Sequence, residues 1–159
     1  MSNLELELID VHNYSREKHI LYELAEKIWT NPESLENIKH SINRWGMTKT
    51  ESGEYFYIKL DGERVGLTGY FIPDITRGIF GLRHHGTLIK GTGRLALDVL
   101  VNYLKEKYSE FDCLIELVPE GKEDLIKKFE NWGFILTPDG VPDWEPKKDY
   151  YKYAMIRRG

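Results

Sequence analysis

The chain has 159 residues, of which 41% are hydrophobic, 13% aromatic and 30% charged, a balance typical of a folded globular protein rather than a disordered chain. Its 22 basic and 26 acidic side chains give a formal net charge of −4, which argues against a dedicated nucleic-acid-binding protein because such proteins need a basic surface. No apolar run approaches the roughly 20 residues of a membrane-spanning helix, and the N-terminal segment lacks the apolar core of a signal peptide.

A strand and two helices are predicted first. Leucine at every second position over residues 4–8 predicts a half-buried strand. Ser15 is expected to cap a first helix, whose apolar residues recur at helical spacing. Asn31 and Pro32 supply the cap and the first-turn proline of a second helix, which Gly46 is expected to end.

Three strands are predicted next. Residues 55–60 and 64–72 flank Asp61-Gly62, a dipeptide typical of a two-residue hairpin turn. A further strand near residues 78–85 is expected to run antiparallel to its predecessor, because the connection between them is short.

Helices and strands then alternate to the end of the chain. Residues 94–108 have the clearest helical periodicity. The strand predicted at 113–118 should run parallel to its predecessor, since a helix separates the two. A helix ended by Gly133 and a short strand at 134–136 follow, and after a polar loop a strand at 150–156 closes the chain.

The resulting order, β-α-α-β-β-β-α-β-α-β-β, predicts an α/β (α+β) fold with a mixed, mostly antiparallel twisted sheet flanked by helices. We expect one domain over residues 1–159, because the length suits a single domain and no repeat, low-complexity tract or linker divides the chain. Cys113 is the one cysteine and has no internal disulfide partner, which fits a reducing cytosol and a cytoplasmic protein.

The most informative local feature is a glycine-rich turn, Gly86-Thr87-Leu88-Ile89-Lys90-Gly91-Thr92-Gly93-Arg94, between a strand and the long helix. Gly91 and Gly93 let the backbone bend tightly, so that successive N–H groups point at one spot near the helix N-terminus. Lys90 and Arg94 can pair with phosphate oxygens. The turn therefore predicts a diphosphate site, against the simpler interpretation that two glycines only shape a tight connection.

Two known phosphate motifs fit this turn poorly. A Walker A loop needs Lys-Ser/Thr after its second glycine, and Thr92-Gly93 stands there instead. A dinucleotide fingerprint matches through Gly91, Gly93 and Ala96, with Asp112 near the distance expected of a ribose contact. That fingerprint usually opens its fold, whereas two helices and several strands precede it here. A dinucleotide-binding protein is therefore kept only as a lesser alternative.

From the first strand to the last, the chain resembles the GNAT superfamily of N-acetyltransferases. In that family an Arg/Gln-x-x-Gly-x-Gly/Ala motif binds the pyrophosphate of acetyl-coenzyme A, and Leu88-Ile89-Lys90-Gly91-Thr92-Gly93 matches its two glycines. The segment 129–134 resembles the family's Tyr-x-x-x-Gly-Phe. The resemblance implies the GNAT fold, an acyl-coenzyme A-dependent N-acyltransferase activity, and acetyl-coenzyme A as co-substrate without a metal.

The resemblance also implies a set of cofactor-binding residues: Leu88, Ile89, Lys90, Gly91, Thr92, Gly93, Arg94 and Phe129. Two of them depart from the family's pattern. Leu88 replaces the leading Arg/Gln, whose charge Lys90 or Arg94 is expected to supply. Phe129 replaces a tyrosine that often protonates the departing thiolate, so either another group acts as the acid or the chemistry is weakened.

Acetyl transfer needs a base for the amine and an acid for the thiolate. His84 and His85 are candidate bases because imidazole titrates near neutrality, although adjacent strand residues face opposite ways and at most one addresses the acceptor. Glu116, within an apolar strand, is a rival base. Tyr151 is the candidate acid that we single out among the strand tyrosines. Packing or hydrogen bonding within the fold is the competing interpretation for each.

A loop with Asp139, Asp143, Trp144 and Glu145 suits a cationic amine, because carboxylates pair with an ammonium group and an indole face attracts it. We therefore expect an amine of a small molecule or peptide as the acceptor, and a monomer or homodimer. A solvated, turn-rich loop is the competing interpretation. Beside the enzyme hypothesis stands a catalytically weak acyl-coenzyme A-binding module, which the two departures from the family pattern motivate.

Overall fold

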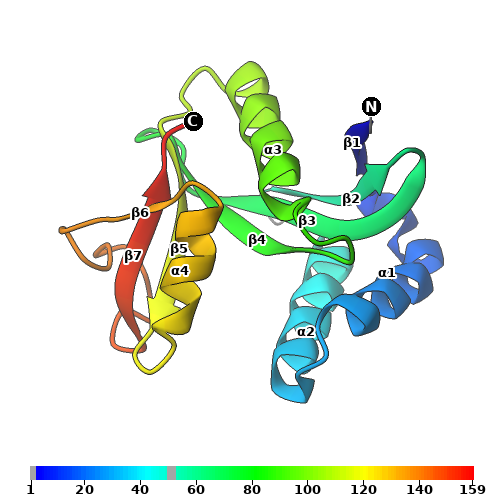
Figure 1. Ribbon diagram of the computed structural model, residues 1–159, viewed down its shortest axis with the longest axis horizontal. Coiled ribbons are helices and arrows are strands. Elements are labelled where there is room, and N and C mark those ends of the chain that lie inside the picture. Colours follow the sequence, from blue (N-terminus) through cyan, green and yellow to red (C-terminus); the bar gives the residue numbers. More distant parts are fainter. Residues whose placement is uncertain (1–2, 50–52) are drawn as a thin grey trace. The chain divides into compact units, whose positions relative to one another are not determined.

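The computed structural model describes residues 3–49 and 53–159, and its elements follow the predicted order (Figure 1). The helices are the 3₁₀ turn η1 (Val11–Asn13), α1 (Tyr14–Ile28), α2 (Pro32–Thr48), α3 (Gly93–Lys107) and α4 (Asp124–Asn131). The strands are β1 (Leu4–Leu8), β2 (Glu54–Leu60), β3 (Glu63–Asp74), β4 (Ile79–Thr87), β5 (Cys113–Pro119), β6 (Ile135–Leu136) and β7 (Tyr151–Arg157).

The strands form one sheet in the order β1-β2-β3-β4-β5-β7-β6. β4 and β5 are parallel, as predicted, whereas β2 is antiparallel to both β1 and β3, and β7 to both β5 and β6. This mixed, mostly antiparallel sheet confirms the predicted fold class. It also rules out the doubly wound parallel sheet of a dinucleotide-binding fold, so that alternative is wrong.

The chain divides into two compact units. The first comprises the described residues up to Phe71 together with Arg83–Val99, and the second comprises Ile72–Leu82 and Leu100–Gly159. No helix among the residues described has the length and apolar composition needed to cross a membrane.

In the first unit, α1 and α2 pack with β2 and β3 around an apolar core (Figure 1). Trp45 is buried in this core and makes edge-to-face contacts with the rings of Tyr14 and Tyr55. Each large apolar side chain that is fully buried contributes about 1.5–3 kcal/mol to folding. The other buried members are Ile9, Leu21, Leu24, Ala25, Ile38, Ile42, Tyr57 and Leu67.

The local signals predicted some boundaries and missed others. Asn31 caps α2 as predicted, because its Oδ1 accepts hydrogen bonds from the N–H groups of Glu33 and Ser34 (3.0 and 3.2 Å). The predicted cap at Ser15 is wrong: the chain enters α1 at Tyr14 through η1. The turn at Asp61-Gly62 has positive φ at both residues (51° and 87°), as the hairpin prediction requires.

Gly46 does not end α2, which continues to Thr48 and stops at Lys49, a residue with φ of 55°. The prediction failed because this glycine serves packing rather than termination. A Cβ on Gly46 would overlap the ring of Tyr14, so only glycine lets α1 and α2 approach this closely here.

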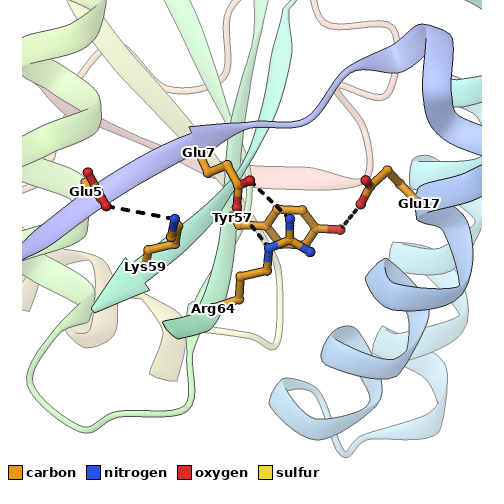
Figure 2. A network of polar contacts seen from close by, with 6 residues as sticks. All are labelled: Glu5, Glu7, Glu17, Tyr57, Lys59 and Arg64. Atoms are coloured by element: carbon orange, nitrogen blue, oxygen red, sulfur yellow. Dashed lines mark hydrogen bonds and ion pairs between the residues drawn. The ribbon is translucent and has the colours of Figure 1, made fainter. Parts of the chain in front are cut away.

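A network of polar contacts joins α1 to the first three strands through Glu5, Glu7, Glu17, Tyr57, Lys59 and Arg64 (Figure 2). Arg64 donates from Nε and Nη2 to the two carboxylate oxygens of Glu7 (2.9 and 3.1 Å), and this pairing lowers the pKa of Glu7. The same guanidinium lies over the ring of Tyr57, 3.9 Å from its centroid. The Tyr57 hydroxyl donates to Glu17 Oε2 (2.7 Å), which ties α1 to β2.

We expect Gly46→Ala to destabilise the protein by about 1–2 kcal/mol, because overpacking against Tyr14 costs more than the helix gains from alanine. Urea unfolding would measure the change. In a Tyr14→Ala background the same substitution should lose its cost, since the ring is then absent. A gain of stability in the otherwise unchanged protein would contradict the packing explanation.

Candidate functional site

The glycine-rich turn lies between β4 and α3, as predicted, and hydroxyl groups hold its two ends together. Thr92 Oγ1 donates to the carbonyl of Ile89 (2.6 Å) and lies 3.0 Å from Thr87 Oγ1. Gly91 has φ of 86°, in the region that favours glycine, although a Cβ there would meet nothing within 4 Å. Glycine is therefore needed at this position for backbone conformation rather than for space.

The turn leads directly into the N-terminus of α3. The carbonyl of Thr92 accepts the first helical hydrogen bond, from Ala96 N–H (2.9 Å). The N–H groups at the start of α3 precede this first bond of the i→i−4 series, and they carry the partial positive charge of the helix end. Lys90, Gly91 and Arg94 are exposed beside them. This arrangement can hold an anion such as a diphosphate.

The two adjacent histidines of β4 face opposite sides of the sheet, as the alternation of a strand predicts. His84 stacks on Tyr55, with ring centroids 6.3 Å apart and an interplanar angle of 7°. His85 instead contacts Thr68 of β3. Thr68 pairs with Phe56, the neighbour of Tyr55 in β2. Side chains of neighbouring strand residues point to opposite faces of the sheet, so Thr68 and Tyr55 lie on opposite faces, and so do the two histidines that contact them.

His84 interrupts the regular geometry of β4 with φ of 30°. The guanidinium of the preceding residue, Arg83, also lies over the ring of Tyr55, 5.4 Å from its centroid. Burial, together with the charge of Arg83, lowers the pKa of His84 to about 4. An imidazole that holds a proton so weakly is poorly matched to take one from an amine near neutral pH.

His85 is buried, and both of its ring nitrogens are engaged. Nδ1 lies 2.8 Å from Thr68 Oγ1, and Nε2 lies 2.7 Å from the carbonyl oxygen of Gly93. The structure therefore joins this candidate base to the glycine-rich turn through Gly93, and to β3 through Thr68, which sequence analysis did not single out. No local signal reveals such a contact, since the two residues are 17 positions apart.

Glu116 is the first residue of β5 beyond its pairing with β4. That pairing covers three rungs and ends at Gly81 and Ile115, after which β5 pairs with β7 alone within the second unit. Burial raises the pKa of Glu116 to about 8, against the smaller opposing effect of the Lys128 charge. No cation within the described ranges 3–49 and 53–159 forms a salt bridge with its carboxylate. A carboxyl with this pKa can both accept and return a proton near neutral pH.

Tyr151, at the start of β7, lies close enough to Glu116 to sense its charge. Burial first, then the charges of Glu145 and Glu116, raise the pKa of the Tyr151 hydroxyl. The phenol therefore keeps its proton. The structure thus brings together two of the four candidate catalytic residues, Glu116 and Tyr151, within the second unit.

Two other residues of the second unit serve packing. Phe129 is buried in α4 and packs on Trp132 and Phe134, with ring centroids 5.7 and 5.9 Å apart. Burial raises the pKa of the Cys113 thiol, which disfavours a nucleophilic thiolate. In the described part of the chain, no group of three His, Cys, Asp or Glu side chains is placed to hold a metal ion.

A pocket of about 500 Å³ lies in the second unit beside the loop that sequence analysis singled out. Its lining residues are Asp74, Arg77, Ile79, Asp139, Gly140, Val141, Pro142, Asp143 and Trp144. Three carboxylates face one guanidinium, so the lining is acidic. The Trp144 N–H is buried and has no hydrogen-bond partner among the residues that the structure describes. Asp74 at the end of β3 and Arg77 in the turn after it were missed, because their proximity to this loop is not local in sequence.

A smaller pocket of about 260 Å³ shares part of this lining and extends it over the sheet. Ile79, Asp139 and Pro142 belong to both pockets, and Ile115 and Ile156 add an apolar floor. The smaller pocket also contains the charged Asp112 and Arg158, so the two linings together combine carboxylates, guanidinium groups and apolar side chains. Such a combination suits an amine whose cationic group is attached to an apolar or ring-shaped body.

A scan against protein-family models gives no match, and a search of curated proteins gives none either. Among solved structures the chain is similar to the aminoglycoside acetyltransferase AAC(6')-Ib in complex with coenzyme A, at 18% identity and a TM-score of 0.68, over 98% of this chain and 95% of that one. It is also similar to a dodecameric spermidine N-acetyltransferase from Vibrio cholerae, at 11% identity and a TM-score of 0.61, over 98% and 93% of the two chains. At these identities the likeness establishes the fold.

We expect the unusual carboxyl of Glu116 to be visible in the pH dependence of stability. Its pKa is higher in the folded than in the unfolded protein, so the folded state binds the extra proton and stability falls as pH rises from about 4.5 to about 8. Between pH 7 and 9 the unchanged protein should lose about 1 kcal/mol more than Glu116→Gln. His84 does not interfere, since its lowered pKa changes stability only below about pH 6.5.

Urea unfolding at the two pH values would measure this difference, and a carbon NMR titration of the carboxyl would measure the pKa itself. Parallel pH profiles for the two proteins would show that Glu116 titrates like a solvated carboxylate.

Proposed function

The chain has the GNAT fold, and we propose that it is an acetyl-coenzyme A-dependent N-acetyltransferase that transfers the acetyl group directly to the amine of a small molecule. The observation that carries this proposal is the glycine-rich turn, which stands at the N-terminus of α3 within this fold. Gly91 and Gly93 occupy the two glycine positions of the family's pyrophosphate motif. The proposal takes residues 1–159 as one acetyltransferase domain in the cytoplasm, as a monomer or homodimer.

We assign the diphosphate of the cofactor to residues 88–94. The backbone N–H groups at the start of α3 would receive its oxygens, and the exposed Lys90 and Arg94 would supply the charge that Leu88 lacks. Leu88 and Ile89 are 43% and 42% exposed, so their apolar side chains are available to the pantetheine. Acetyl-coenzyme A supplies the activated acetyl group when bound, and no metal is required for this transfer.

We assign the role of general base to Glu116 rather than to either histidine. His85 has both nitrogens engaged, and His84 is too weak a base, whereas a carboxyl with a pKa of about 8 is matched to proton transfer near neutral pH. Tyr151 is a second proton donor near Glu116, because its raised pKa keeps the phenol protonated.

The acceptor is a cationic amine in this proposal, and its distal part occupies the acidic pocket around Asp139 and Trp144. Asp74 pairs with Arg77 (3.5 Å) and Asp143 with Lys148 (3.0 Å), so Asp139 is the lining carboxylate best placed to meet an added cation. The solved structures of similar fold include acetyltransferases of aminoglycosides and of spermidine, which support this class of acceptor.

One observation favours a second candidate, a coenzyme A-binding module with little turnover. Phe129 has no proton to donate and is packed between aromatic rings, so α4 offers no hydroxyl where the family often has a tyrosine. Binding of acetyl-coenzyme A without acetyl transfer to any amine would identify this candidate.

Calorimetry with coenzyme A tests the cofactor site. Gly93→Asp should weaken binding about tenfold or more, because a carboxylate at the start of α3 repels the diphosphate, while helix N-termini tolerate aspartate well. Gly93→Asn is the matched control of similar size without the charge, and its affinity should stay much closer to that of the unchanged protein.

Glu116→Gln should bind coenzyme A normally but lose about 100-fold or more of its turnover. Absence of binding by the unchanged protein would reject the proposed function.

Steady-state kinetics with spermidine and with an aminoglycoside tests the acceptor site. Asp139→Asn should raise the KM for the amine about threefold to tenfold, because a charge-assisted contact is lost, while kcat changes little. Asp149→Asn is the control, since it removes the same charge from an exposed residue outside the pocket lining. Equal effects of the two substitutions would assign the change to net charge rather than to the pocket.

A further inference from the structure

His85 links a strand of the sheet to the start of α3 through a single buried ring. Its Nδ1 lies 2.8 Å from Thr68 Oγ1 in β3, and its Nε2 lies 2.7 Å from the carbonyl oxygen of Gly93. His85 is 5% exposed and Thr68 is 0% exposed, so water does not compete for either contact. Buried polar contacts of this kind rigidify the elements that they join.

The carbonyl group of Gly93 determines which ring nitrogen of His85 carries a hydrogen. A carbonyl oxygen can only accept, so Nε2 carries the hydrogen that is donated to Gly93. In the neutral ring Nδ1 is then an acceptor, and it takes the hydroxyl proton of Thr68. The three residues thus form a chain of hydrogen bonds that runs in one direction, from Thr68 through His85 to Gly93.

These two hydrogen bonds orient the peptide group between Gly93 and Arg94. The C=O and N–H of a trans peptide point in opposite directions, so a carbonyl held by His85 directs the N–H at the first turn of α3 away from the ring. Donation to the carbonyl also polarises the peptide and makes its N–H a better donor. That N–H lies in the first turn of α3, ahead of the first i→i−4 bond of the helix.

A second contact holds the other side of the turn. Thr87 Oγ1, at the end of β4, lies 3.0 Å from Thr92 Oγ1, and the carbonyl of Val65 accepts from the N–H of Leu88 (2.8 Å). These contacts fix where the turn leaves the sheet, whereas His85 fixes how α3 begins. His85 is thus a contact between the sheet and the first peptide group of α3.

We propose that His85 is a positioning residue, which acts through Gly93 to aim the N-terminal peptide of α3 at the diphosphate of coenzyme A. This inference rests on the proposed function and gives a reason for the buried histidine that acetyl transfer itself does not use. It also divides the roles of two adjacent residues. His84 lies on the same face of the sheet as Tyr55, whereas His85 contacts the turn to which we assign the cofactor.

Calorimetry and phosphorus NMR with coenzyme A test this role. His85→Asn keeps a polar group near Thr68 but cannot reach Gly93, and it should weaken coenzyme A binding about fivefold to tenfold. His85→Gln places an N–H donor near the position of Nε2 and should restore most of the affinity. The diphosphate signals of bound coenzyme A should shift in His85→Asn and return toward their original positions in His85→Gln.

Tyr57→Phe is the control for a general loss of stability, because it removes one hydrogen bond in the same unit, to Glu17, without touching the turn. It should lower the Tm and leave the affinity for coenzyme A unchanged. If His85→Asn does not fold, Thr68→Val is the second variant. It removes the hydrogen bond from Thr68 to His85 and should weaken coenzyme A binding about threefold.

The outcomes separate the inference from the proposed function. Unchanged affinity and unchanged phosphorus signals in His85→Asn, or in Thr68→Val where that variant is used, would overturn the positioning role while the proposed function stands. Failure of the unchanged protein to bind coenzyme A would overturn the proposed function and this inference with it.

Discussion

The parallel pairing of β4 with β5 is the constraint on which the candidate site depends. Parallel neighbours require a crossover, so the chain must leave the end of β4 and enter α3 before it returns as β5. The entry into α3 is where backbone N–H groups have no helical acceptor. The pairing lasts for three rungs only, and Glu116 follows its last rung directly. The positions of the glycine-rich turn and of Glu116 thus both follow from one short parallel ladder.

Buried polar groups around the turn are paired rather than merely enclosed. Thr68, His85 and Thr92 are all buried: Thr68 contacts His85, His85 contacts the carbonyl of Gly93 at the start of α3, and Thr92 donates to Ile89 within the turn. A buried polar group without a partner would cost stability, so these contacts stabilise the observed arrangement of the turn. The structure therefore gives a glycine-rich segment a fixed shape, which would spare the cofactor the entropy of ordering it.

Sequence patterns predicted what depends on neighbours along the chain and missed what depends on neighbours in space. The Asp61-Gly62 turn and the Asn31 cap are local signals, and both were correct. Gly46 was misinterpreted because the ring that demands a glycine there belongs to another helix. The same division holds for the site. Gly91 and Gly93 were proposed from their spacing, whereas the contact of His85 with Thr68 and the pKa of Glu116 arise from burial, which periodicity does not quantify.

The missing hydroxyl at Phe129 is less damaging to the proposed reaction than the family pattern suggests. The thiol of coenzyme A, as a free thiol, has a pKa of about 8.5, and the pKa of Glu116 is about 8. A proton taken from the amine by the Glu116 carboxylate could therefore pass to the departing thiolate at almost no cost in free energy. Tyr151, whose pKa is raised above that of an ordinary phenol, is a weaker acid than Glu116 for that step. One buried carboxyl would then serve as base and acid in turn, and its burial, rather than a tyrosine on α4, would supply the matched pKa.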